Sequence, residues 1–114
     1  MKKIQLILFI AALSLVIVNC GSSKKAKVEP KISYKTDIEP IISTSCIPCH
    51  IPPQGKKEPL ENYDHVKANI ASILERVQLP QDNRKFMPPV NKKPALTADQ
   101  IALLLKWQQQ NMPE

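Results

Sequence analysis

The pentapeptide Cys46-Ile47-Pro48-Cys49-His50 holds two of the three cysteines and one of the two histidines in this chain of 114 residues. The two cysteines stand three positions apart, and the histidine follows the second cysteine directly. Cysteine pairs at this spacing occur in redox-active thiol proteins, zinc sites, disulfides and haem attachment motifs. The rest of the sequence decides between these four settings.

The histidine directly after the second cysteine favours covalent attachment of haem. Attachment needs two thiols, which add to the two vinyl groups at one edge of the macrocycle and form thioethers. The adjacent imidazole then lies under the iron as its proximal ligand, for which neutral histidine nitrogen is well suited. We therefore predict that Cys46 and Cys49 bind one haem c covalently and that His50 ligates the iron.

The other three settings fit the sequence less well. A thioredoxin-like redox pair requires a βαβ context, and the chain has no convincing alternating β segment. A zinc site would combine Cys46 and Cys49 with His50 and His65, but the direct adjacency of Cys49 and His50 makes tetrahedral closure awkward. A plain disulfide between the two cysteines is the third alternative.

Met87 is the predicted second axial ligand. It lies in Arg84-Lys85-Phe86-Met87-Pro88-Pro89-Val90, where the following proline forces Met87 into an extended conformation and the proline pair stiffens the loop. Met87 lies 37 positions after His50, which is far enough for the chain to pass around a haem and return on its opposite face. His65, near the start of a predicted helix, is a weaker candidate, and Met112 is expected to fray near the C-terminus.

The N-terminus has the layout of an export signal. Met1-Lys2-Lys3 is a basic start, and the apolar run over residues 4–18 is shorter than the ~20 residues that a membrane-spanning helix needs. Cys20 ends the run and is followed by small residues, which looks like the lipobox of bacterial lipoproteins. We predict a signal peptide over residues 1–19, with an uncleaved signal anchor as the alternative because Asn19 departs from the usual small residue.

Lipidation of Cys20 would tie the protein to the bacterial cell envelope. Residues 20–33 are polar, cationic and without a period, which predicts a flexible tether ahead of a domain over residues 34–114. The expected location is therefore exported, lipid-anchored and facing the periplasm. Gly21 in place of aspartate slightly favours the outer membrane.

The composition predicts one small domain with a thin core. Residues 1–19 hold 14 of the apolar residues, and only about 37% of the remaining chain is apolar, with few aromatic side chains. Small domains of this kind usually need disulfides, a metal or another non-protein component. The length and cysteine count exclude a multidomain enzyme, a polytopic membrane protein and a dense disulfide scaffold.

Apolar spacing predicts three helices joined by proline-rich loops, an all-α fold. The first covers residues 37–45, and the second runs from Asn62 to before Pro80. A capping box over Thr97-Ala98-Asp99-Gln100 opens the last. The expected core positions are Ile38, Ile41 and Ile42 in the first helix, Val66, Ile70, Ile73, Leu74 and Val77 in the second, and Ile101, Leu104, Leu105 and Trp107 in the last.

Over about residues 34–110 the chain resembles a class I c-type cytochrome. The resemblance rests on the attachment motif, the preceding Asp37-Ile38-Glu39-Pro40-Ile41, the Phe86-Met87-Pro88-Pro89 loop and the terminal helix that reaches Trp107. It implies a cytochrome c-like fold of three to four short helices around one haem. Two departures concern the subfamily alone: Ile51 stands where many members have glycine soon after the histidine, and Asn111 replaces glycine after the final helix.

The resemblance implies an electron carrier, not an enzyme, in which His50 and Met87 fill both axial positions. Its partners would be redox proteins of the envelope, and acidic ones could be steered by Lys56, Lys57, Lys85, Lys92 and Lys93, unless these lysines serve solubility alone. Nucleic acid is not expected as a partner of an exported chain. The alternatives from other classes are a haem-based sensor or peroxidase-like protein with a displaceable Met87, and a non-haem thiol protein.

Overall fold

The structure of the protein is a computed structural model that describes residues 28–55 and 57–114. The predicted signal peptide, the predicted lipidation site Cys20, most of the predicted tether and Lys56 lie outside the described residues. Within the described ranges all regular elements are helical and there is no strand, which confirms the predicted all-α class. None of the helices in this part of the chain has the length and apolar character needed to cross a membrane.

The first helical segment begins earlier than predicted. A π-helical turn, η1 (Tyr34–Ile38), leads directly into α2 (Glu39–Ser45). The Ser33 side chain accepts a hydrogen bond from the Thr36 amide, and the Asp37 carboxylate accepts one from the Ser33 amide at 2.8 Å. These caps satisfy amide groups that have no partner inside the helix. The predicted core positions of this segment, Ile38, Ile41 and Ile42, are all buried.

The other two helices begin where their capping residues predict. Asn62 caps α3 (Tyr63–Val77) by accepting from the His65 amide at 2.9 Å. Thr97 and Gln100 form both halves of the capping box that opens α4 (Ala98–Gln109). All five predicted core positions of α3 are buried, and in α4 the fully buried residues are Leu104 and Trp107.

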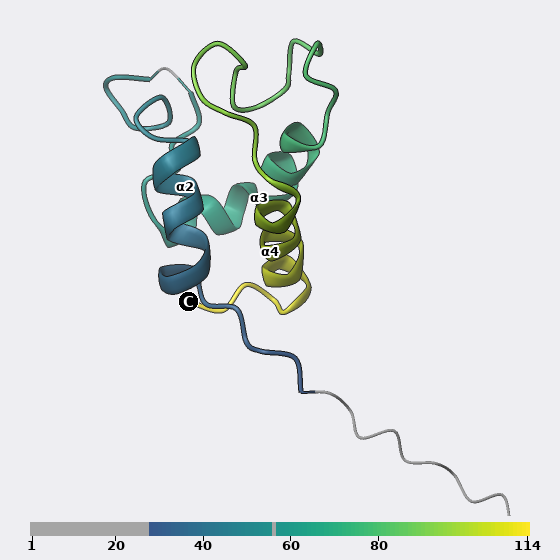
Figure 1. Cartoon of the computed structure of the whole chain (residues 1–114). Coiled ribbons are helices and arrows are strands. Elements are labelled where there is room, and N and C mark those ends of the chain that lie inside the picture. Colours follow the sequence, from purple (N-terminus) through teal and green to yellow (C-terminus); the bar gives the residue numbers. More distant parts are fainter. Residues whose placement is uncertain (1–27, 56) are drawn as a thin grey trace, which may run out of the picture.

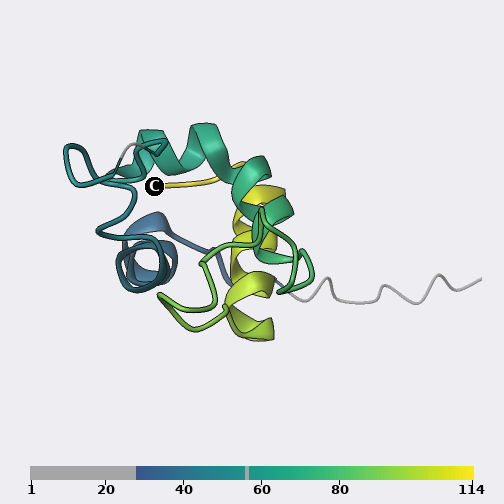
Figure 2. The ribbon, with the colours of Figure 1, turned by 90° about the horizontal axis from the view of Figure 1, so that it is seen from above.

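The helices leave both long loops at one end of the domain. α2 and α4 stand on opposite sides, α3 crosses behind them in the view of Figure 1, and α4 packs against η1 and α3 (Figures 1 and 2). The loop over 46–62 and the loop over 78–97 lie at the end where α2 finishes and α4 begins (Figure 1). The described N-terminal segment and the C-terminus lie at the opposite end.

Chain termini and aromatic side chains close the end away from the loops. Trp107 lies with its ring centroid 5.7 Å from that of Tyr34 and 6.1 Å from that of Tyr63, and its indole N–H donates to the Pro113 carbonyl at 2.7 Å. The Tyr63 hydroxyl donates to the Met112 carbonyl at 2.7 Å. The expectation that Met112 frays is therefore wrong, because this aromatic cluster holds the tail.

Packing also begins before the predicted domain boundary at residue 34. Ile32 is buried in the core, and its amide donates to the Gln110 side chain at 2.8 Å. The same Gln110 side chain donates to the Pro30 carbonyl at 3.1 Å. The last residues of the expected tether therefore belong to the fold, because α4 offers them both apolar and hydrogen-bonding partners.

Candidate cofactor-binding site

A cavity of about 540 Å³ lies between the two loops and one face of α3. Cys46, Cys49, His50 and Met87 all line it. The structure thus brings together the four described residues that the sequence predicts for haem binding, although Met87 comes from a different loop. The volume of the cavity falls within the ~300–1,000 Å³ that is usual for small-molecule and cofactor sites.

The attachment segment starts where α2 ends. Cys46 is the C-cap of α2, and its amide donates to the Ile42 carbonyl at 2.8 Å. The His50 amide donates to the Cys46 carbonyl at 3.2 Å, so the five residues form a compact turn. This turn presents both cysteine side chains and the imidazole to the cavity.

Both thiols of the motif are free in the structure. Burial raises the pKa of the Cys46 thiol to about 11, and the charge of Lys93 offsets this only in part. Reactive thiols in redox proteins have a lowered pKa, since the thiolate is the attacking species. Cys46 therefore lacks the activation that the redox-thiol alternative requires.

The imidazole of His50 is fixed from behind by the loop that follows it. His50 Nδ1 lies 2.6 Å from the Glu58 carbonyl oxygen. A carbonyl can only accept, so Nδ1 carries the proton and Nε2 keeps its lone pair for a ligand. The Leu60 amide also donates to the His50 carbonyl at 2.9 Å, which closes the loop back on the motif. Such partners orient metal-binding histidines in many proteins.

Gly55 allows this loop to pass close to the motif. A Cβ atom at this position would overlap the carbonyl oxygen and carbon of Cys49. The Gly55 amide donates to the Ile51 carbonyl at 3.1 Å, which holds the loop at this approach. The sequence analysis missed both Gly55 and the Glu58 carbonyl. The signal for Gly55 was that it is the only glycine within the predicted domain.

The two sequence neighbours of Met87 fix its position in the loop. Phe86 and Pro88 are buried, and Met87 itself is half-buried. The Met87 amide donates to the Arg76 carbonyl near the end of α3 at 3.3 Å. The loop thus places Met87 at the cavity from the side of α3, whereas the two cysteines lie at the end of α2.

The wall formed by α3 combines apolar and polar side chains. Ile73 and Val77 line the cavity beside the polar residues Asn69, Ser72 and Arg76. Their spacing of three and four residues places them on one face of the helix. Among the described residues, no carboxylate lies within salt-bridge distance of the half-buried Arg76. From the sequence, Ile73 and Val77 are expected as core positions, and the polar members of this face are not predicted.

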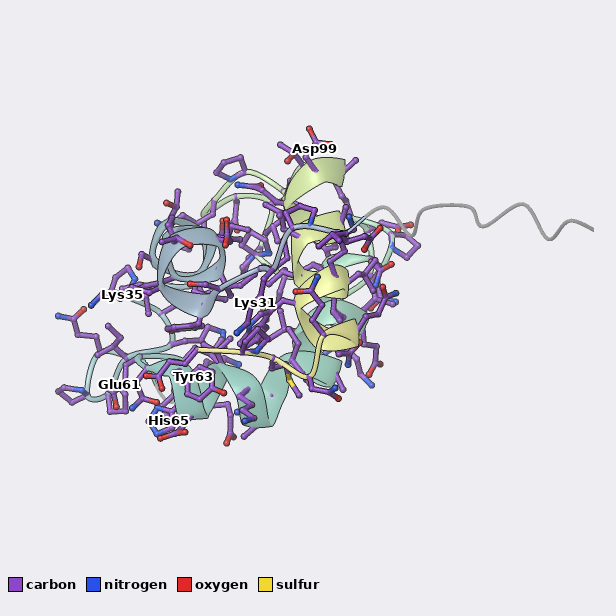
Figure 3. The ribbon with its side chains drawn as sticks, turned by 90° about the horizontal axis from the view of Figure 1, so that it is seen from below. Lys31, Lys35, Glu61, Tyr63, His65 and Asp99 are labelled. Atoms are coloured by element: carbon purple, nitrogen blue, oxygen red, sulfur yellow. The ribbon has the colours of Figure 1, made fainter. Side chains whose placement is uncertain are left out.

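The two weaker ligand candidates lie elsewhere. Neither His65 nor Met112 lines the cavity. His65 sits at the outer edge of the domain near the start of α3, 3.8 Å from the Glu61 carboxylate (Figure 3). Over residues 28–55 and 57–114, no three His, Cys, Asp or Glu side chains gather as a metal-binding group. The zinc alternative, which needs His65 beside the cysteines, therefore has no support from the geometry.

The chemistry of the four lining residues fits haem c. Two thiols can form the thioethers, an imidazole with a free Nε2 can serve as one axial ligand, and a thioether can serve as the other. Comparison with protein-family models finds no match, and comparisons with curated proteins and with solved structures find no significant match. The motif and the geometry of this cavity are therefore the grounds on which a function can be proposed.

Proposed function

We propose that this protein is a monohaem c-type cytochrome that carries electrons in the bacterial cell envelope. The observation that supports it most is that Cys46, Cys49, His50 and Met87, selected from the sequence in two separate loops, line one cavity of cofactor size. In this proposal Cys46 and Cys49 hold the haem through thioethers, while His50 and Met87 are its axial ligands. The finer description of the fold as cytochrome c-like belongs to the same proposal.

Each residue has a distinct task in this function. The Glu58 carbonyl keeps the His50 ring in one orientation and one tautomer. Apolar side chains of the cavity, including Leu60, Ile73 and Leu96, exclude water from the cofactor. When bound, the haem would supply a one-electron Fe(III)/Fe(II) couple, and a methionine ligand favours its ferrous state. With His50 and Met87 both ligating the iron, the protein would act as an outer-sphere electron carrier.

The proposed setting is the periplasmic face of a membrane. Export by residues 1–19 and lipidation of Cys20 would anchor the domain there, which also suits haem attachment outside the cytoplasm. The partners would be redox proteins of the envelope. Lys57, Lys92 and Lys93 line the cavity and Lys85 lies on the Met87 loop, so an acidic partner would meet cations beside the cofactor.

A second candidate is a haem protein whose Met87 is displaced by a small ligand, as in a sensor or a peroxidase-like protein. The half-burial of Met87 in a loop with few hydrogen bonds to the rest of the domain favours it as an alternative. Carbon monoxide distinguishes the two. Ready binding to the reduced protein, together with no long-wavelength Met–Fe(III) absorption band in the oxidised protein, would overturn the carrier proposal.

Haem staining on a denaturing gel tests the proposal directly. The full chain is produced in a bacterium with haem attachment machinery, and covalent haem is expected to stain at the mass of the protein. A variant with both Cys46→Ala and Cys49→Ala is expected to lose the stain. If the wild-type protein does not stain, the cytochrome proposal is wrong, and the alternative is a non-haem thiol protein.

A further inference from the structure

The side chain of Lys93 connects the loop over 78–97 to the end of α2, at the edge of the cavity. Its Nζ donates to the Thr44 carbonyl at 2.7 Å, across 49 residues of sequence. Thr44 lies in the last turn of α2, two residues before Cys46, and Lys93 lies six residues after Met87. The contact therefore runs between the loop that carries the predicted distal ligand Met87 and the helix that directly precedes the predicted attachment motif.

Among the described residues, no other hydrogen bond joins the loop over 78–97 to the attachment side of the cavity, that is, to α2 or to the loop over 46–62. Within residues 28–55 and 57–114, the loop over 78–97 makes most of its hydrogen bonds to itself, and Met87 bonds to Arg76 on α3. Lys93 provides the one hydrogen bond from this loop to α2 or to the loop over 46–62 among the described residues. Without it, no hydrogen bond among the described residues would join this loop to α2 or to the loop over 46–62.

Lys93 provides a positively charged partner for the C-terminal end of α2. The last carbonyl groups of a helix have no partner within it, and they favour a nearby cation. α2 has no basic residue in its own last turn. Lys93 supplies that charge from another segment, and its half-buried side chain makes a charge-assisted hydrogen bond, which is stronger than a neutral one.

We propose that Lys93 is a positioning residue that keeps the Met87 loop closed over the cofactor and so keeps small ligands away from it. The inference rests on the proposed haem site and goes beyond it, because it assigns control of ligand access to a lysine that is not itself a ligand. When the Lys93–Thr44 hydrogen bond is lost, the loop opens more often, and a competing ligand displaces Met87 from the haem iron more readily.

The neighbouring Lys92 offers a matched control. It also lines the cavity and carries the same charge, but its side chain makes no hydrogen bond among the described residues. Lys93→Met removes the donor while keeping a long side chain, and Lys92→Met removes a charge from almost the same place. A difference between the two variants therefore reports the Lys93–Thr44 bond and not the loss of positive charge at the rim.

The test is a titration of the oxidised, full-length haem protein with imidazole, followed by its visible spectrum. Lys93→Met is expected to bind imidazole about tenfold more tightly than wild type, since a hydrogen bond from a charged group stabilises the closed loop to about this degree. Lys92→Met is expected to stay within about twofold of wild type. Lys93→Arg, which can still reach a carbonyl, is expected to restore most of the protection.

Equal imidazole affinity in Lys93→Met and Lys92→Met would overturn the proposal. If Lys93→Met yields no holoprotein, Lys93→Gln is titrated in its place, because its shorter amide does not reach Thr44, and the same equality would overturn the proposal. Haem staining of the wild-type chain is carried out first. Its absence refutes the cytochrome assignment, whereas stained variants with equal affinities refute the role of Lys93 alone.

Discussion

The Nδ1 atom of His50 lies 2.6 Å from the carbonyl oxygen of Glu58. This contact makes the loop over 51–60 part of the candidate site, because the loop both orients the imidazole and selects its tautomer. A change that displaces this loop should therefore affect the site even when it leaves every ligand residue in place. Gly55 is the position at which such a change can be made with a single methyl group.

Gly55→Ala is expected to destabilise the folded haem protein by about 1–3 kcal/mol, the usual cost of overpacking. The new Cβ would overlap the backbone of Cys49, which cannot move aside as a flexible side chain could. The free energy of unfolding in urea measures the effect. Gln54→Ala, at the exposed neighbouring position, is the control and should change stability by less than about 0.5 kcal/mol. Equal stability of the two variants would show that the loop does not approach Cys49 as described.

Replacing both Cys46 and Cys49 by alanine is expected to leave the exported chain unfolded. The described core is small, and the cavity wall includes the half-buried apolar side chains Met87 and Leu96, which a cofactor would cover. Circular dichroism should show loss of helix and no cooperative melting. A helical, cooperatively melting double variant would mean that the helices fold without haem.

Local sequence signals predicted most of the helical fold. The caps Asn62 and Thr97 marked helix starts correctly because capping depends on residues within one turn. The apolar stripe of α3 was predicted in full because a 3.6-residue period appears directly in the sequence. The start of the first helix was placed too late, since η1 is a π-helical turn whose Ser33 cap lies within the expected tether.

The parts that could not be predicted depend on contacts between distant segments or on backbone atoms. The burial of Ile32 and the order of the tail at Met112 require α4 and the aromatic cluster to be in place. The bond from Lys93 to Thr44 joins residues 49 apart, and a backbone carbonyl such as that of Glu58 has no residue type that would mark it. Sequence patterns identified the chemical groups of the candidate site, whereas their supports became visible only in the structure.

If the chain binds haem as proposed, Arg76→Met is expected to lower the reduction potential of that haem. Arg76 is a half-buried cation on the cavity wall with no carboxylate within salt-bridge distance among the described residues. A nearby positive charge favours the reduced state, which carries one more electron, so its removal favours the oxidised state. The effect should be on the order of 1 kcal/mol, or about 40 mV for one electron.

Arg84→Met provides the control for this measurement. Arg84 is exposed on the same loop as Met87, but it does not line the cavity. Solvent and salt screen an exposed charge, so its removal should shift the potential much less. Potentiometric titration of both variants at one ionic strength gives the comparison. A larger shift for Arg84→Met would place the cofactor nearer to the outer loop than to the wall formed by α3.

Cys20→Ser is expected to release the protein from the membrane or leave it unprocessed, while its haem content stays unchanged. Cys20 is separated from the described fold by several polar residues, and the predicted haem ligands all lie far along the chain. A single acyl chain already gives reversible membrane binding, and two chains give a stable anchor. Cell fractionation measures membrane association, labelling with a radioactive fatty acid measures lipidation, and haem staining measures haem content. Ser22→Ala is the control and should remain labelled and in the membrane fraction. If wild type takes up no label yet stays in the membrane, and Cys20→Ser behaves identically, residues 1–19 act as an uncleaved signal anchor and Cys20 is an incidental thiol.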